Sequence, residues 1–491
     1  MPQLPNRIMS ELFKPNLFSV FRLVRINTKL FFRALFCIAC FLIQSKSSLA
    51  QDYFTIAKVT VSGNKITKER VIRRELMYQE GDTIHSDHLQ KQLDRIKFNV
   101  QNTLLFIFVT VDTVQLGPGS LELKVAVKER WYIFPVPYLY VADRNFSTWI
   151  QNKDPKRLDY GITIFWKNFT GHKDRLKVNI GHGFNENYYL EYQFPYLNRS
   201  QTLGLVVYGS FLHNHEIAYE SAQNTLHFYR ETDRYVRREW DSYLGLTYRQ
   251  GLYNLHELDL GYVNTKVADT IVEMNPNFFG LNSNQAASFY LIYLYKRDLR
   301  DYKIFPLKGY YLEAELGKFG LGLLNNELKG PLYLSAKAAG YWSFSDRAYF
   351  QLGAKVKAGT GIIPYYNRFG LGYELDFVRG YEKYVVEGRY YGYLKSNIKF
   401  ALLKDFVIKL KFIPTEKFNT IPFSLFFNMH TDLGYVYDDQ WTMKNPLNNT
   451  FMMGSGMGLE LLSYYDRIWR LEYSINRKGQ SGVFLTFFTS F

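Results

Sequence analysis

The chain has 491 residues, a formal net charge of +15, 40 tyrosines, 40 phenylalanines and two cysteines. Beyond the N-terminal segment no apolar run reaches the ~18 residues that a membrane-spanning helix requires, which argues against a helical membrane protein. The positive charge is spread along the chain rather than clustered, and this argues against nucleic-acid binding. High aromatic content without long apolar blocks fits a membrane β-barrel or a soluble β-rich protein, and composition alone does not separate them.

Residues 1–50 have the organisation of a secretory signal peptide. A basic segment precedes an apolar core from Ala34 to Ile43, and small residues stand just before Gln51. The core is too short to span a membrane as a helix. Both cysteines, Cys37 and Cys40, fall inside this segment, so we expect neither disulfides nor thiol chemistry in the processed chain.

Residues 51–130 predict a small α/β domain in the order β-α-α-β-β. Val59 and Val61 alternate in a first strand, and a short helix follows. Ser86 is a suitable N-cap for a second helix. Two further strands complete the domain, an apolar one from Leu104 to Val111 and an alternating one from Leu121 to Val127.

Residues 131–491 consist of alternating segments of about ten residues, separated by polar loops. In one segment Trp469 and Leu471 alternate with Arg470 and Glu472. One apolar face opposite a face of charged residues and glycines is the pattern of a transmembrane antiparallel β-barrel with a wet lumen. A soluble sandwich also alternates, but its strands tend to be shorter. We count about 16 strands, consistent with an even-stranded bacterial barrel.

A long connection at about residues 361–388 separates the eleventh from the twelfth expected strand. Connections of this length are usually functional or disordered. This one carries Tyr, Leu, Phe and Val, which disordered segments generally lack, so we expect an ordered loop.

The sequence of this loop resembles a family motif. Val378-Arg379-Gly380-Tyr381, preceded by Gly370-Leu371-Gly372, is similar to the signature of the sixth extracellular loop in the Omp85 superfamily, the outer-membrane proteins of the BamA, TamA and surface antigen D15 type. Residues 51–130 likewise resemble the POTRA domain that precedes these barrels, here a single copy. With the POTRA domain in the periplasm, the connection after the eleventh strand is extracellular, as the family requires.

The resemblance assigns a tethering role to the loop arginine. In the family this arginine pairs with acidic residues on the lumen wall, and Arg379 and Asp432 stand at the matching positions. A second family partner, a glutamate on the twelfth strand, is missing near Lys399. Either one carboxylate suffices, or another such as Glu460 substitutes.

The C-terminal segment supports the same location. Val483, Leu485, Phe487 and Phe491 fall on one face of a terminal aromatic strand. Such a strand, with Phe487 and Phe491 as its aromatic markers, resembles the signal by which barrel proteins are recognised for insertion into the outer membrane.

The resemblance implies assembly, insertion or translocation of polypeptides at the bacterial outer membrane, without catalytic residues, metal or cofactor. The implied partners are outer-membrane lipids and lipopolysaccharide, unfolded outer-membrane or secreted proteins, and periplasmic or lipoprotein accessory subunits. A passive channel and a barrel-embedded lipid-modifying enzyme are the alternatives, and lipid export stays open. His182, His213 and His215 are scattered and match no hydrolase motif, so we interpret them as loop or rim residues.

Overall fold

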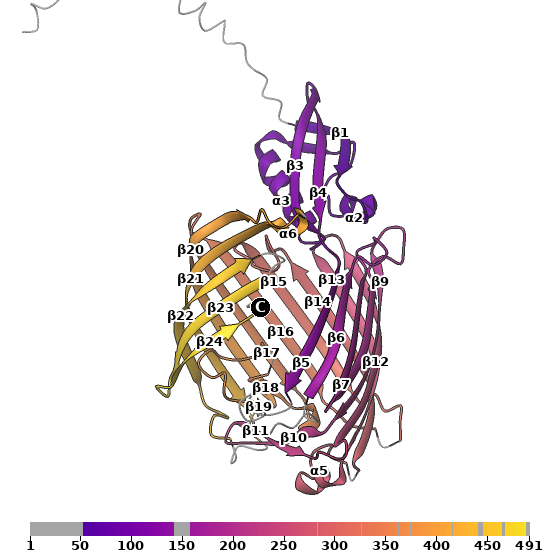
Figure 1. The fold of residues 1–491 in the computed structure, drawn as a ribbon, viewed down its shortest axis with the longest axis vertical. Helices are drawn as coiled ribbons and strands as arrows, with labels where there is room; N and C mark the ends of the chain where they lie inside the picture. The colour runs from indigo at the N-terminus through magenta and orange to yellow at the C-terminus, as the bar shows by residue number, and fades with distance from the viewer. Residues whose placement is uncertain are drawn as a thin grey trace, which may run out of the picture. The chain divides into compact units, whose positions relative to one another are not determined.

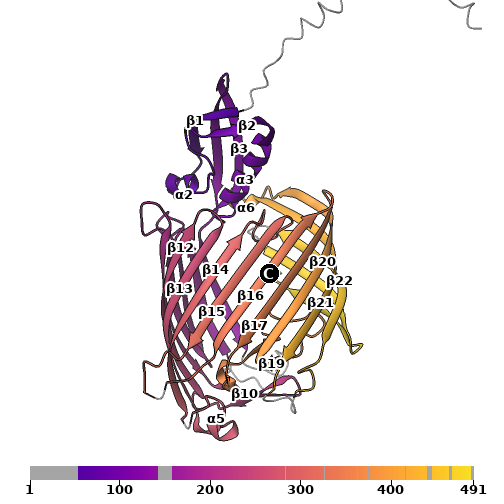
Figure 2. The same cartoon turned by 180° about the vertical axis from the view of Figure 1, so that it is seen from behind.

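The computed structural model describes residues 53–141, 158–281, 283–325, 327–361, 363–373, 375–414, 416–439, 445–463 and 467–487. Residues 1–50, the expected signal peptide, lie outside this part. Residues Phe54–Phe491 form one compact unit that contains a small α/β domain and a large sheet (Figures 1 and 2). No helix in the described ranges is both long and apolar enough to cross a bilayer.

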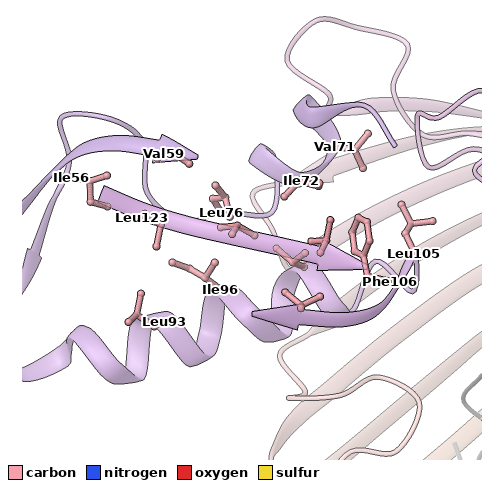
Figure 3. Packing of buried hydrophobic residues seen from close by; sticks show 14 of the residues in the cluster. Ile56, Val59, Val71, Ile72, Leu76, Leu93, Ile96, Leu105, Phe106 and Leu123 are labelled. Carbon is pink, nitrogen blue, oxygen red and sulfur yellow. The ribbon is translucent and has the colours of Figure 1, made fainter. Parts of the chain in front are cut away.

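The N-terminal domain is a four-stranded sheet with two helices. Its elements in chain order are β1 (Tyr53–Ser62), α2 (Glu69–Arg73), β2 (Thr83–His85), η1 (Ser86–His88), α3 (Leu89–Gln101), β3 (Phe106–Gly117) and β4 (Ser120–Glu129). The sheet order is β2-β1-β4-β3, so β3 is an edge strand. Ile96 of α3, Leu123 of β4 and Phe106 of β3 are at most 1% exposed and share one core with Val71 and Ile72 of α2 (Figure 3).

The start of the second helix differs from the prediction. Ser86 does not cap an α-helix: Ser86–His88 forms the 3-10 turn η1, and α3 begins at Leu89. The His85 ring nitrogen Nδ1 accepts a hydrogen bond from the Asp87 N–H at 3.3 Å. The 3-10 turn therefore takes the place of the first helical turn that the sequence predicted, and α3 begins three residues after Ser86.

The remaining chain forms one antiparallel sheet of sixteen strands, which confirms the expected number. The strands are β5 (Ile133–Val141), β6 (Leu158–Lys167), β7 (Arg175–Gly183), β8 (Glu186–Phe194), β9 (Leu203–Asn214), β12 (Arg237–Gln250), β13 (Asn254–Val267), β14 (Gln285–Asp298), β15 (Gly309–Phe319), β16 (Leu332–Ser343), β17 (Ala348–Gly359), β20 (Tyr390–Lys409), β21 (Thr420–Tyr437), β22 (Met452–Ser463), β23 (Arg467–Asn476) and β24 (Ser481–Thr486). The long loop follows β17, the eleventh strand, as predicted.

In the large sheet the apolar side chains are exposed and the charged side chains are buried, the reverse of a soluble protein. Along β23 burial alternates strictly. Trp469 and Leu471 are 46% and 48% exposed, whereas Arg470 and Glu472 are 5% and 3% exposed. A polar interior and an apolar exterior are the arrangement of a transmembrane β-barrel, whose outer face contacts lipid. The expected fold class, a barrel preceded by a small α/β domain, is therefore confirmed.

Two elements of this region were not predicted. The hairpin β10 (Glu216–Ala222) and β11 (Thr225–Arg230) forms a separate two-stranded sheet between β9 and β12. The helix α5 (Asp269–Met274) follows β13 and packs Ile271 against Phe278 and Phe279. Both elements lie at the end of the barrel that carries the long loop (Figures 1 and 2).

A buried ion pair joins the α/β domain to the barrel. Glu75, only 2% exposed, accepts hydrogen bonds from both terminal nitrogens of Arg249 on β12, at 2.6 and 2.7 Å. Lys173, in the turn between β6 and β7, lies 3.3 Å from the same carboxylate. Burial favours the neutral carboxyl, but Arg249 and Lys173 outweigh it and hold the pKa of Glu75 well below its ordinary value.

Two more turns of the barrel contact the same domain. Arg95 Nε donates to Tyr253 Oη at 2.8 Å, beside the turn between β12 and β13. Asn102 Nδ2 donates to the Asp301 carbonyl at 2.8 Å, and the Lys303 N–H donates to Asn102 Oδ1 at 2.9 Å. The domain is thus attached through three separate turns.

We expect Glu75→Gln to lower the free energy of unfolding at pH 7 by about 3–5 kcal/mol, because it removes the buried carboxylate charge that pairs with Arg249 and Lys173. The folded-state pKa of Glu75 is depressed, so its contribution is complete above the unfolded pKa of about 4.5 and is lost as the pH falls below that value. Urea titrations of the refolded protein between pH 3 and pH 7 measure this. Glu69→Gln breaks an exposed ion pair with Arg73 and is the control. It should change the free energy of unfolding little.

We also expect a depth-dependent penalty for charge on the outer face. Leu471→Arg, at the middle of β23, should destabilise the protein in bilayers by about 2–4 kcal/mol. Phe344→Arg, at the turn after β16, should cost only about 0–1 kcal/mol. Equal penalties at the two sites, measured by unfolding from vesicles, would contradict a lipid-facing assignment of β23.

Candidate functional site in the barrel lumen

The connection between β17 and β20 folds into an ordered structure. The short strands β18 (Phe369–Leu371) and β19 (Val386–Gly388) pair with each other and form its neck. Beyond the neck, Val378 and Tyr381 are 1% and 4% exposed and pack in a cluster with residues of β20 and β21. The loop therefore lies against the inner wall.

Arg379 is the central contact of this loop. Its side chain is 6% exposed and forms a bidentate pair with Asp432 of β21, with Nη2 to Oδ1 at 2.6 Å and Nε to Oδ2 at 2.8 Å. Nη1 lies 3.0 Å from Oε1 of Glu472 on β23. The guanidinium thus joins the loop to two strands that are not neighbours.

The second carboxylate is not the one that the sequence suggested. Glu460 does not substitute for the missing glutamate of the twelfth strand. Its two oxygens lie 2.6 Å from Lys399 Nζ and 2.9 Å from Arg470 Nε. The alternation puts Glu460 and Glu472 on the same polar face, but only the stagger of β22 and β23 decides which one reaches Arg379.

The charges around Arg379 compensate one another. Burial disfavours the charged guanidinium, but Asp432 and Glu472 outweigh this and raise the pKa of Arg379 above its ordinary value. The loop arginine therefore stays charged in the barrel interior.

Glycines in the wall make room for the loop backbone. A Cβ on Gly454 of β22 would lie 1.7 Å from the carbonyl oxygen of Arg379, and one on Gly434 of β21 would lie 2.4 Å from Val378 Cγ2. In the loop itself Gly380 has φ +89°, a conformation that side chains rarely adopt. The V-R-G-Y motif and the wall glycines thus fit together sterically as well as electrostatically.

A second group of contacts fixes the part of the loop before Arg379, and sequence reasoning missed it. Asp376 binds Lys355 Nζ at 2.5 Å, Tyr391 Oη at 2.6 Å and Tyr393 Oη at 3.2 Å. Arg368 Nη2 binds Asp438 Oδ1 at 3.1 Å. The only available signal was the placement of these tyrosines and this lysine on lumen-facing positions of adjacent strands.

The β10–β11 hairpin braces the loop from a third direction. Its two-residue turn, Gln223-Asn224, has positive φ at both positions, as a type I′ turn requires. The Val385 N–H donates to the Asn224 carbonyl at 2.9 Å. Asn445, before β22, accepts from the Asn224 N–H at 2.8 Å and donates to the Ser221 carbonyl at 3.0 Å. The hairpin turn thus lies between the loop and the β21–β22 connection.

The ends of the large sheet are the first and last barrel strands. No hydrogen-bonded ladder joins β24 to β5 in the described part of the chain, and the two strands lie on the same side of the barrel (Figure 1). Phe487 packs edge-on against Trp469 of β23, with ring centroids 4.6 Å apart. Phe491, the other expected marker of the terminal strand, lies outside the described residues.

His182, His213 and His215, the histidines considered in the sequence, contact carboxylate, hydroxyl and carbonyl oxygens of the barrel. His182 and His213 both lie beside Glu186, with Nδ1 to carboxylate distances of 3.2 and 2.9 Å. The His215 ring contacts the Phe184 carbonyl. Among the described residues no group of three His, Cys, Asp or Glu side chains is arranged to hold a metal ion.

Comparison with known proteins agrees with this architecture. The model of the Omp85 superfamily domain matches residues 168–476, and that of the surface antigen variable number repeat, the POTRA domain, matches residues 54–130. The chain belongs to the Omp85 superfamily. No curated protein matches it significantly.

Solved structures are similar to this chain at low sequence identity. CdiB from Escherichia coli is 13% identical with a TM-score of 0.52, over 88% of this chain and 75% of that chain. BamA from Haemophilus ducreyi lacking POTRA domains 1-3 is 15% identical with a TM-score of 0.49, over 89% of this chain and 84% of that chain.

We expect Arg379→Ala to detach the Omp85 loop from the wall, because the substitution removes the buried partner of Asp432 and one of the partners of Glu472, at a cost of about 3–5 kcal/mol. Trypsin digestion of intact cells, which probes Lys383 within the loop, measures the release. Arg389→Ala breaks a more exposed pair with Asp439 and should leave the loop protected. Equal protection of the wild type and Arg379→Ala would show that the ion pairs do not hold the loop.

Proposed function

We propose that this Omp85 protein inserts client proteins into the bacterial outer membrane through the seam between β24 and β5, with its POTRA domain in the periplasm. Membership of the superfamily supports insertion or translocation of polypeptides. We favour insertion over translocation because no ladder joins β24 to β5 in the described part of the chain. An unpaired strand edge presents N–H and C=O groups that another strand can bind.

The lumen offers a less suitable path. The loop is held at Arg379, at Asp376 and at the β10–β11 turn. A passive channel or a translocated chain requires an open lumen, so all three attachments would have to be displaced. Insertion at the seam leaves them in place, and in this proposal they stiffen the part of the wall that leads through β21 and β23 to the seam strand β24.

The same proposal defines the partners. The clients are unfolded polypeptides with alternating apolar residues, because only such segments can pair with the seam and face lipid. Outer-membrane lipids and lipopolysaccharide contact the apolar outer face. Periplasmic or lipoprotein subunits assist delivery, and no step requires a cofactor or a catalytic residue.

We expect a disulfide across the seam to lower the rate of client insertion at least tenfold. A reductant should restore the rate. Pairs of cysteines, one on β24 and one on β5, are screened for disulfide formation. The two native cysteines both fall in residues 1–50, outside the barrel sequence. Folding of a urea-denatured barrel client into vesicles, followed by gel mobility without heating, is the readout. A pair at Ala338 and Ala354, which are opposite each other on β16 and β17, is the control and should have no effect.

The outcomes separate the candidate functions. Insertion that continues with the seam closed would contradict the seam mechanism. A client that crosses into the vesicle interior rather than its membrane would favour translocation. No folding of the client, even with the seam reduced, would reject the assembly function.

A further inference from the structure

The β20–β21 hairpin extends beyond its neighbours on the side that carries the POTRA domain. β17 pairs with β20 only as far as Phe400, and β22 pairs with β21 only from Ser424 onward. The remaining part, Leu402–Lys409 with Thr420–Phe423, is here called the β20–β21 extension. On the β21 side the ribbon runs from Phe426, which is opposite Ala401, to Thr420, a distance of six residues or about 20 Å at about 3.3 Å per residue. Barrels of this class normally have short turns at this end.

The β20–β21 extension is apolar and has unpaired edges. Phe406, Val407 and Ile408 are 53%, 44% and 42% exposed. In the described ranges these residues pair with β21 alone, so the other edge of this strand is open. A two-stranded ribbon is only marginally stable in water and requires a packing partner.

A cavity of about 710 Å³ lies between the β20–β21 extension and the POTRA domain. Four consecutive residues of the edge strand β3, Ile107 to Thr110, line one side. Val407, Pro422 and Phe423 of the extension line another side. The cavity is therefore bordered by the edge strand of one sheet and by the unsupported ribbon of another.

The lining chemistry favours an apolar ligand. Aromatic side chains come from both walls and from the floor, where Phe305 and Phe426 have ring centroids 4.8 Å apart. The charged residues of the lining are balanced, with Lys97, Lys308, Lys404 and Arg130 against Asp94, Asp301, Asp346 and Asp405. Such a lining does not select a strongly acidic or basic ligand. Unpaired strand edges select a polypeptide backbone, because it supplies N–H and C=O groups at the right spacing.

We propose that this cavity binds one extended, aromatic-rich segment of a client protein, with the edge of β3 on one side and the β20–β21 extension on the other. The inference rests on the proposed function, and it names the place where a client is held before insertion. The volume falls in the range of ordinary ligand sites and suits a short segment rather than a folded domain.

The tip of the extension connects this site with the seam. Phe418 of α6 (Glu416–Asn419), at the hairpin tip, lies against Trp131, with ring centroids 6.2 Å apart. Trp131 stands two residues before β5, the first strand of the seam. The hairpin therefore runs from strands β20 and β21 to the beginning of β5, and a segment bound in the cavity lies close to the strand with which it would pair.

Peptide binding tests the proposal. The probe is a fluorescent peptide with the sequence of residues 482–491, which begins within β24 and contains four phenylalanines. Its affinity for the full-length protein in phosphatidylethanolamine–phosphatidylglycerol vesicles is measured by anisotropy. We expect Phe423→Ser and Phe108→Ser each to weaken binding at least fivefold. Phe344→Ser, 73% exposed and outside the cavity lining, is the matched control and should bind like the wild type.

The serine variants could also weaken binding by destabilising the protein, so cross-linking provides a second test that does not depend on a loss of affinity. Val407→Cys in the cavity should link to a peptide that carries a thiol-reactive group, and unlabelled peptide should compete. Leu402→Cys, exposed but outside the lining, should not link. Unchanged affinity of Phe423→Ser, or equal linking at both cysteines, would overturn the proposal. Wild-type protein that inserts clients without binding the peptide would overturn this site alone, whereas absence of insertion would overturn the proposed function.

Discussion

A buried arginine charge is the constraint on which the rest of the barrel interior depends. Arg379 cannot lose its proton at any physiological pH, so its burial requires carboxylates in a fixed geometry. Asp432 and Glu472 supply them from β21 and β23, and the pairing fixes the stagger of these strands relative to the loop. Around them Glu460 pairs with Lys399 and Arg470, and Arg470 also lies 3.7 Å from Glu472. The C-terminal third of the barrel is therefore one electrostatic unit, and the loop is part of that unit.

This unit explains why the glycines of the wall are as important as its charges. A guanidinium can make a fork-to-fork contact only if the loop backbone approaches the strands closely. Gly454 allows the Arg379 carbonyl to lie where a Cβ would otherwise stand. The same strands present Met453, Leu471 and Tyr473 outward, each at least 40% exposed. One short stretch of sheet thus meets lipid on one face and a tightly fitted polar loop on the other.

Sequence alternation predicted most of the barrel because its period of two is set locally by the pleat. It gave the number of strands and placed Glu472 on the polar face, whereas the roles of Arg379 and Asp432 came from the resemblance of the loop to the family motif. It could not choose between Glu460 and Glu472 as the partner of Arg379, because that choice depends on the stagger between strands. It also failed for the β20–β21 extension, where Phe406, Val407 and Ile408 are consecutive and apolar, and for Ser86, which lies in the 3-10 turn η1 before the helix. Each failure lies where tertiary contact rather than local pattern decides.

The attachments of the POTRA domain bear on how a client would travel. Glu75 is held by Lys173 and Arg249, and further contacts reach Tyr253 and Asp301. The turns β6–β7, β12–β13 and β14–β15 of the barrel therefore restrain the domain. A domain restrained in this way cannot carry a bound segment over a long distance by swinging. Delivery then requires that the binding edge already lie near the point of insertion. The β20–β21 extension meets this requirement, because it borders the cavity beside β3 and reaches Trp131 at the beginning of β5. A fixed domain and a long barrel hairpin are therefore complementary features of one mechanism.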